Sequence, residues 1–121
     1  MEPASTAGPV ALVGSGEFTP AMAAVDRLLL RGRPPRAVFL PTAAGQEGAE
    51  RIGYWVRLGR THYEDLGVEP VPLLVLDRAS ADDPELAAEV EGAGLVYLSG
   101  GDPAYLAATL AGTRVGDAIL A

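Results

Sequence analysis

The residues of this chain best suited to chemistry stand directly after an apolar run, where the sequence reads SGGDP at residues 99–103. Adjacent glycines allow a sharp turn and bring backbone N–H groups close to whatever binds above them. Asp102 is a typical N-cap, and Pro103 suits the first helical position because no N–H is needed there. A strand end, free amides and a helix N-terminus meet here, an arrangement that can bind an anion or a developing oxyanion. A plain strand-to-helix turn accounts for the same residues, and this stretch alone does not decide between the two.

A dinucleotide-binding loop is a second hypothesis, for the glycines near the N-terminus. Gly14 and Gly16 match the start of the G-x-G-x-x-G pattern, but Thr19 stands where the third glycine belongs. The second apolar run ends in Pro41 and Thr42, without the acidic residue that binds a ribose. We therefore expect no nicotinamide, flavin or other cofactor.

The sequence holds no complete nucleophilic pair or triad. Neither Ser15 nor Ser99 lies in a G-x-S-x-G segment. The single histidine, His62, falls inside a helical pattern, where a core or surface role is favoured over catalysis. Glu17 and Asp77 each follow an apolar run and could supply a carboxylate for acid–base work. Asp77 is better explained as a turn former, whereas for Glu17 a catalytic role and a solvated loop position both stay open.

Composition excludes several classes of function. The chain has 121 residues, enough for one domain, and a net charge of −7. No basic stripe is present to neutralise phosphates, so we expect no nucleic-acid partner. All nine basic residues are arginines, and without lysine neither a Schiff base nor a Walker-type phosphate site can form. Without cysteine there is no thiolate nucleophile, and one histidine cannot supply a histidine-rich metal site.

The N-terminus and the hydropathy pattern bear on location. Residues 1–8 carry neither the positive region nor the long apolar run of a signal peptide, and we expect them to form a disordered tail. No stretch approaches the roughly 20 apolar residues of a membrane span, so we expect no membrane association and a cytoplasmic location. Residues 9–121 then form the N-terminal part of a single α/β domain.

Four apolar runs alternate with helical patterns along the chain. The predicted strands are residues 10–14, 37–41, 71–76 and 95–99. Each is apolar throughout, which is typical of parallel strands covered on both faces. Pro70 and Pro72 confine the start of the third strand to an edge or an unpaired position. The sequence therefore predicts a doubly wound, flavodoxin-like parallel sheet of about four strands.

Helical spacing marks the segments between these strands. In the first helix the predicted inner face consists of Met22, Val25, Leu28 and Leu29. In the long helix at residues 48–66 the apolar stripe consists of Ile52, Trp55, Val56, Gly59, Tyr63 and Leu66. We expect Trp55 to be largely buried against the sheet. Shorter helices are predicted to begin near Pro84, Pro103 and Arg114.

Ligands of doubly wound sheets bind beyond the carboxyl ends of the strands, near the point where the winding direction reverses. The candidate cleft-lining residues at these ends are Gly16, Glu17, Thr42 and Ser99. The candidate residues on the oxyanion and substrate side are Gly100, Gly101 and Asp102. At least one of the two glycines should have a positive φ. The Asp102 carboxylate should accept a hydrogen bond from the amide of Ala104 or Tyr105.

Three segments resemble the dipeptidase E and cyanophycinase family of serine peptidases. They read ALVGSGEFTPAM (residues 11–22), LPTAAGQEG (residues 40–48) and VYLSGGDPAYLAATL (residues 96–110), and the last is the most specific. The resemblance covers essentially the whole chain from about Val10 and implies a class I glutamine amidotransferase-like fold. It also implies hydrolysis of peptide bonds, often beside an acidic residue, with a small peptide or amide as the substrate.

The catalytic pair of that family has no counterpart in this sequence. The resemblance implies a serine on a G-x-S-A-G elbow and a later histidine, with Gly101, and Gly100 beside it, in the oxyanion segment. The elbow is expected one helix and one strand beyond Ala121, and His62 does not match the family's histidine. The chain therefore resembles the N-terminal portion of such a hydrolase, incomplete at its C-terminus and inactive alone. The alternative is a non-catalytic α/β module for binding or association, and homo-oligomerisation is a further expectation.

Overall fold

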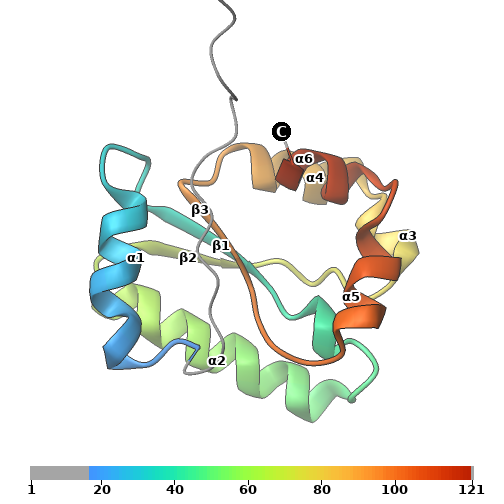
Figure 1. Cartoon of the computed structure of the whole chain (residues 1–121), viewed down its shortest axis with the longest axis horizontal. Helices are drawn as coiled ribbons and strands as arrows, with labels where there is room; N and C mark the ends of the chain where they lie inside the picture. The colour runs from blue at the N-terminus through green and yellow to red at the C-terminus, as the bar shows by residue number, and fades with distance from the viewer. Residues whose placement is uncertain (1–16, 121) are drawn as a thin grey trace, which may run out of the picture.

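The computed structural model describes residues 17–120. Strands and helices alternate along the chain, as the sequence pattern predicts (Figure 1). The strands are β1 (Arg36–Leu40), β2 (Glu69–Pro72) and β3 (Leu95–Leu98). The α-helices are α1 (Ala23–Leu30), α2 (Ala49–Asp65), α3 (Arg78–Ala81), α4 (Pro84–Glu91), α5 (Pro103–Leu110) and α6 (Arg114–Leu120), and short 3₁₀ turns cover Pro20–Met22 and Thr42–Ala44.

β1 is the central strand of a parallel sheet with the order β2-β1-β3. Val38 of β1 pairs with Val71 of β2 and with Val96 of β3, which fixes the register of all three strands. The chain passes from β1 to β2 and then returns to the other side of β1, so the winding direction reverses between β1 and β3. With helices on both faces, this is the parallel α/β arrangement of a doubly wound, flavodoxin-like fold. The strand predicted at residues 10–14 and the tail predicted at residues 1–8 lie outside the described residues.

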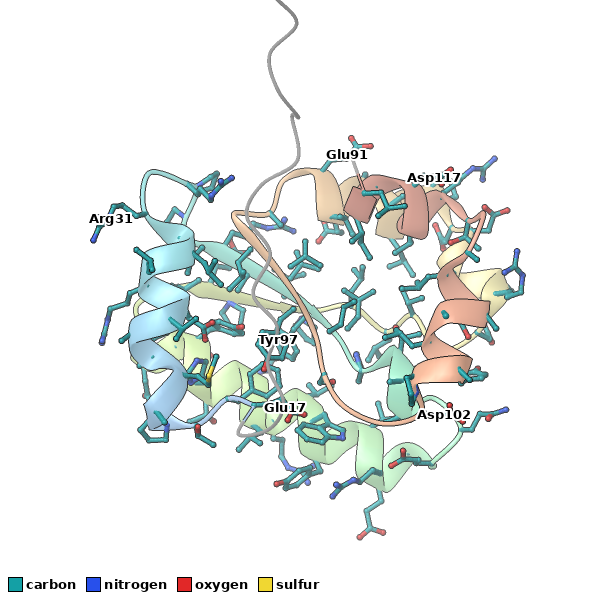
Figure 2. The ribbon with its side chains drawn as sticks, in the orientation of Figure 1. Glu17, Arg31, Glu91, Tyr97, Asp102 and Asp117 are labelled. Atoms are coloured by element: carbon teal, nitrogen blue, oxygen red, sulfur yellow. The ribbon has the colours of Figure 1, made fainter. Side chains whose placement is uncertain are left out.

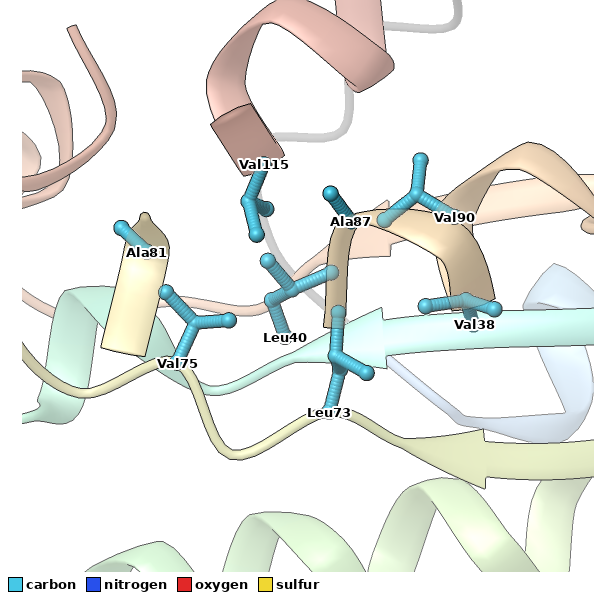
Figure 3. Packing of buried hydrophobic residues seen from close by; sticks show 8 residues of the cluster. All are labelled: Val38, Leu40, Leu73, Val75, Ala81, Ala87, Val90 and Val115. Carbon is cyan, nitrogen blue, oxygen red and sulfur yellow. The ribbon is translucent and has the colours of Figure 1, made fainter. Parts of the chain in front are cut away.

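Side chains of β1 alternate between two hydrophobic clusters, one on each face of the sheet. The aliphatic cluster, under α3, α4 and α6, consists of Val38, Leu40, Leu73, Val75, Ala81, Ala87, Val90 and Val115 (Figure 3). The aromatic cluster, under α1 and α2, consists of Phe18, Leu30, Ala37, Phe39, Tyr63, Val68 and Tyr97. Two complete cores therefore share one central strand, because successive residues of a strand point to opposite faces.

The edge strand β2 begins and ends earlier in the chain than the predicted third strand. The sequence predicts it at residues 71–76, but the ladder with β1 covers Glu69–Pro72. The N–H groups of Glu69 and Leu73 donate to carbonyls of the β1 segment at 2.9 Å each. The two prolines occupy the alternate positions, which face away from β1, so their missing N–H groups cost no ladder hydrogen bond.

The long helix α2 follows the predicted apolar stripe. Gly59 and Tyr63 are buried, and a Cβ at Gly59 would lie 2.7 Å from the ring of Phe39, so only glycine lets the helix approach the strand this closely. Trp55 is half-buried and packs against the aromatic cluster, which meets the prediction of large burial only in part. Within residues 17–120, no helix combines the length and the apolar character needed to cross a membrane.

The predicted inner face of α1 is wrong in phase. Leu28 is 61% exposed, whereas Asp26 and Leu30 are buried. Asp26 turns inward because it pairs with His62 of α2, whose Nε2 lies 2.6 Å from the Asp26 Oδ2 atom. A buried carboxylate with a partner on another helix rotates α1 away from the orientation that apolar spacing alone predicts.

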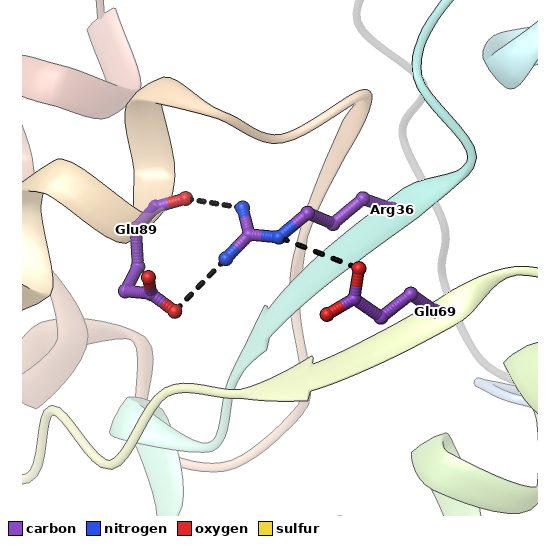
Figure 4. A network of polar contacts seen from close by, with 3 residues as sticks. All are labelled: Arg36, Glu69 and Glu89. Carbon is purple, nitrogen blue, oxygen red and sulfur yellow. Dashed lines mark hydrogen bonds and ion pairs between the residues drawn. The ribbon is translucent and has the colours of Figure 1, made fainter.

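Polar contacts at the start of β1 connect the sheet to both of its neighbours. The Arg36 guanidinium lies 2.9 Å from a carboxylate oxygen of Glu89 and donates to the Glu89 carbonyl at 2.7 Å (Figure 4). On the other side it lies 3.9 Å from the carboxylate of Glu69. These contacts hold β1, β2 and α4 together at the end of the sheet opposite to the candidate site.

Candidate functional site

The winding reversal brings two chain segments together beyond the carboxyl ends of β1 and β3. The Ser99 N–H, after β3, donates to the carbonyl of Leu40 at 3.2 Å. The Asp102 N–H donates to the carbonyl of Ala43 at 2.8 Å. The SGGDP turn therefore lies against the residues that follow β1, at the place where open α/β sheets bind ligands.

Gly101 lies in close contact with the segment that follows β1. Its φ of +152° lies in a region that glycine adopts more readily than other residues, which confirms the predicted positive φ. A Cβ here would overlap the carbonyl group of Ala43 and lie 2.7 Å from the Ala44 nitrogen. Within residues 17–120, the Gly101 N–H has no hydrogen-bond partner. The Gly101 N–H is thus a backbone donor that is available to a ligand as far as residues 17–120 are concerned.

Asp102 caps helix α5, as predicted. Its Oδ1 atom accepts hydrogen bonds from the amides of Ala104 at 2.9 Å and Tyr105 at 3.1 Å. Pro103 occupies the first turn, where no N–H is required. The Tyr105 hydroxyl donates to the carbonyl of Leu76, which ties α5 to the segment after β2. The Asp102 carboxylate is therefore engaged in holding the helix that begins at the turn.

Glu17 reaches the same turn from the other end of the chain. Its Oε2 atom accepts a hydrogen bond from the Gly100 N–H at 3.0 Å, across 83 positions of sequence. Figure 2 shows Glu17 beside the segment that leads from Tyr97 to Asp102. The half-buried Glu17 carboxylate thus contacts the turn, and of the two roles that the sequence leaves open, the solvated loop position does not describe it.

Two polar side chains predicted to line the cleft are buried instead. The Ser99 hydroxyl donates to the Leu40 carbonyl at 3.3 Å. The Thr42 Oγ1 atom is buried and has no hydrogen-bond partner among the described residues. Neither hydroxyl lies beside a base that would activate it, so neither has the geometry of a nucleophile. Gly16, the fourth predicted cleft residue, lies outside the described residues.

A buried Asp26–His62 pair lies in the aromatic half of the molecule. Both side chains are at most 5% exposed, and the second carboxylate oxygen of Asp26, Oδ1, is buried without a partner among residues 17–120. The ring of Phe18 lies 5.9 Å from the His62 ring, centroid to centroid. The pair therefore supports the residue that follows Glu17. Sequence reasoning places His62 in a core or surface role but gives no signal for its partner.

Two tyrosines near this pair have perturbed ionisation. Burial, together with the negative charges of Glu17 and Asp26, raises the pKa of Tyr97 to about 12. Burial also raises the pKa of Tyr63, with an additional contribution from Asp26. Both hydroxyls are buried without a hydrogen-bond partner among the described residues. These tyrosines are neutral at physiological pH and act there as packing groups.

Asp77 confirms its predicted structural role. Its Oδ1 atom accepts a hydrogen bond from the Ser80 N–H at 2.8 Å, and the Ser80 hydroxyl closes a capping box at the start of α3. The hydrogen bonds from the Ser80 backbone and side chain lower the pKa of the Asp77 carboxyl. Asp77 is therefore a helix cap, for a short helix that the sequence pattern does not predict.

An apolar groove of about 340 Å³ lies between β3, α5 and α6. Its larger side chains are Leu98, Leu106, Leu110, Ile119 and Leu120, joined by Asp117. Leu98 is 39% exposed and Leu120 is 80% exposed.

No group of three or more histidine, aspartate or glutamate side chains that could hold a metal ion forms within residues 17–120.

The chain is similar to a solved peptidase structure. The crystal structure of a peptidase from an acI-B1 actinobacterium matches it with a TM-score of 0.85 and 45% sequence identity. The match covers 88% of this chain but 46% of that peptidase chain, so this chain spans less than half of its length. No family model and no curated protein matches the sequence.

Proposed function

We propose that this chain is the N-terminal portion of a serine-peptidase-like hydrolase of the dipeptidase E and cyanophycinase type. The observation that carries the proposal is the Gly101 N–H, which has no partner within residues 17–120 and stands at the winding reversal of the sheet. The 45% identity to a peptidase supports peptidase chemistry in general. The SGGDP turn, the most specific part of the family resemblance, supports the narrower assignment.

In this proposal the chain supplies the oxyanion side of the reaction. Attack on a peptide carbonyl places negative charge on its oxygen, and a preorganised N–H stabilises that charge in the transition state. Gly101 would donate this hydrogen bond, and the N-terminus of α5 beside it adds a favourable dipole. The serine and the histidine would come from the part of the peptidase fold that this chain does not cover.

We propose a small peptide or amide as the substrate, in the cytoplasm. The chain contributes no basic cluster for a nucleic acid, since its net charge is −7. The Ser99 hydroxyl is buried and bonded to a backbone carbonyl, so it offers no substitute nucleophile. The 121-residue chain alone is therefore expected to hydrolyse no aspartyl dipeptide. Turnover by the purified chain that disappears in Ser15→Ala or Ser99→Ala would contradict this expectation.

A fusion tests the proposal directly. The chain is joined to the part of the acI-B1 peptidase that the match leaves uncovered, and hydrolysis of aspartyl dipeptides is measured. We expect the fusion to hydrolyse a dipeptide that neither part hydrolyses alone. A folded fusion without activity against any small peptide or amide would contradict the proposed function.

The apolar groove favours a second candidate, a non-catalytic module for association. Exposed leucines at Leu98 and Leu120 border the groove, and apolar surface of this kind often marks a protein contact. A homo-oligomer is the simplest form of this candidate. Sedimentation of the purified chain separates the two: a monomer that gains activity by fusion supports the hydrolase, whereas an inactive fusion and a stable oligomer support association.

A further inference from the structure

The turn that carries Gly101 is held from two sides. On one side the Asp102 N–H donates to the Ala43 carbonyl, and the close approach of Gly101 to Ala44 leaves no room for a side chain. On the other side the Glu17 carboxylate accepts from the Gly100 N–H at 3.0 Å. A Cβ at Gly100 would lie 2.8 Å from that carboxylate oxygen, so a larger residue here would push the Glu17 carboxylate out of this contact.

Glu17 is itself fixed by the residue that follows it. Phe18 has a φ of +60°, which is unfavourable for an aromatic residue and is maintained only where the surroundings enforce it. Its ring is 4% exposed and lies 4.7 Å from the Tyr97 ring and 5.6 Å from the Phe39 ring, between centroids. The aromatic cluster thus anchors Phe18 and directs the preceding carboxylate at the turn.

The choice of a carboxylate matters for this contact. An ionised acceptor forms a stronger hydrogen bond to an N–H group than a neutral one does. By engaging the Gly100 N–H, Glu17 fixes one peptide of the turn, while the N–H of the next peptide, at Gly101, keeps no partner among the described residues. A donor that stabilises an oxyanion must be held in place before the reaction, because small displacements lower the rate strongly.

We propose that Glu17 is a positioning residue, which orients the Gly100–Gly101 turn so that the Gly101 N–H faces the carbonyl oxygen of a bound peptide or amide. It does not touch the reacting atoms; it acts through the backbone of Gly100. The inference rests on the proposed function for its catalytic meaning, but the positioning itself is a property of this chain and can be measured in it.

Amide hydrogen exchange of the ¹⁵N-labelled 121-residue chain tests the positioning. In Glu17→Ala the Gly100 N–H should exchange at least about 10-fold faster, and the Gly101 amide resonance should move. Glu17→Gln keeps an acceptor oxygen without the charge and should restore part of the protection. Asp83→Ala is the matched control, because Asp83 also accepts a backbone N–H, from Glu85 at 2.8 Å, but on α4. This control should leave both glycine amides unchanged.

Unchanged Gly100 exchange in Glu17→Ala would overturn the inference, and so would a Gln variant that behaves like the Ala variant. If Glu17→Ala does not fold, Glu17→Asp replaces it. Aspartate is one methylene shorter and should give intermediate protection, so protection equal to that of the unmodified chain would count against the inference.

The peptidase fusion adds a catalytic readout. Glu17→Ala should lower kcat by about 10-fold to 100-fold with little change in KM, and Glu17→Gln should recover part of the loss. A rise in KM by about 10-fold to 100-fold in Glu17→Ala, with kcat unchanged, would contradict a role in orienting an oxyanion donor. An inactive fusion together with the expected exchange pattern would refute the proposed function while leaving the control of the turn by Glu17 intact.

Discussion

The two faces of the sheet share β1 but bury different kinds of side chain, aliphatic on one face and aromatic on the other. The aliphatic cluster consists of valine, leucine and alanine side chains, and none of them carries a polar atom. The aromatic cluster includes three aromatic rings with edge-to-face or tilted contacts to Phe18. Beside it lie the buried Asp26–His62 pair and side-chain atoms of Trp55 and other residues that have no hydrogen-bond partner among the described residues.

This difference shows which face serves the candidate site. Aliphatic packing stabilises a fold through burial alone and is tolerant of changes that conserve volume. The aromatic face fixes Phe18 in an unfavourable backbone conformation and thereby places Glu17 against Gly100. Buried polar groups without partners lower stability, and they concentrate on the face that positions the turn.

The largest effect on stability and on the candidate site is expected from Phe18→Ala. Removing the buried ring should lower the free energy of unfolding by about 3–5 kcal/mol and should also release Glu17 from the turn. Leu73→Ala, in the aliphatic cluster, should lower it by about 2–5 kcal/mol without altering the Gly100 amide. Urea unfolding and amide exchange of both variants check this. Equal changes in the exchange rate of the Gly100 amide in the two variants would contradict a special role for the aromatic face.

His62→Leu tests the buried pair. The change leaves the Asp26 carboxylate without its partner, and we expect a loss of about 3–5 kcal/mol in the free energy of unfolding. The double variant Asp26→Leu/His62→Leu removes both polar groups and should recover much of that loss. Urea unfolding of the three proteins measures the coupling. A single variant as stable as the unmodified chain would show that the pair is not needed for stability.

The stability of the chain at alkaline pH depends on the aromatic face alone, because Tyr97 belongs to the aromatic cluster and the aliphatic cluster contains no group that titrates. This effect is expected to be smaller than the two above. The folded chain keeps the Tyr97 proton up to about pH 12, whereas an unfolded tyrosine loses it near pH 10. Between these values the unfolded chain binds fewer protons, so stability falls as pH rises, by about 1.4 kcal/mol per pH unit. The contribution is fully present below pH 10. Tyr97→Phe should reduce the slope measured by urea unfolding between pH 10 and about pH 12 and leave the contribution of Tyr63. An unchanged slope would exclude Tyr97 as one of its sources.

The smallest expected effect is at the helix caps. Asp102→Ala should lower the free energy of unfolding by about 1 kcal/mol, because two amides of α5 lose their acceptor. Asp83→Ala, the matching cap of α4, should cost a similar amount. Thermal unfolding compares the two variants. A loss several times larger for Asp102 alone would mean that it does more than cap its helix.

Local chemistry made much of this structure predictable from the sequence. The SGGDP turn, the cap at Asp102 and the stripe of α2 depend on neighbouring residues, whose preferences are strong. The phase of α1 was not predictable, because it depends on His62, a residue of another helix. The position of β2 depends on which side of the strand its prolines face, and this is decided by pairing with β1.

The candidate site was predictable only in part, for the same reason. Gly100, Gly101 and Asp102 could be identified because adjacent glycines and a cap form a local pattern. The role of Glu17 could not, because its contact with Gly100 joins residues 83 positions apart. Ser99 and Thr42 follow strands as predicted, yet the sequence does not reveal that their side chains turn into the protein.

The most direct test of the account is the effect of Gly101→Ala on kcat of the peptidase fusion. The added Cβ would overlap the Ala43 carbonyl and displace the Gly101 N–H, so kcat should fall by about 10²–10³-fold. Gly112→Ala is the matched control, because Gly112 also has a positive φ, +68°, but has open space at its Cβ position. This control should keep kcat near that of the unmodified fusion. Equal kcat values for the Gly101 and Gly112 variants, both folded, would contradict an oxyanion role for the turn.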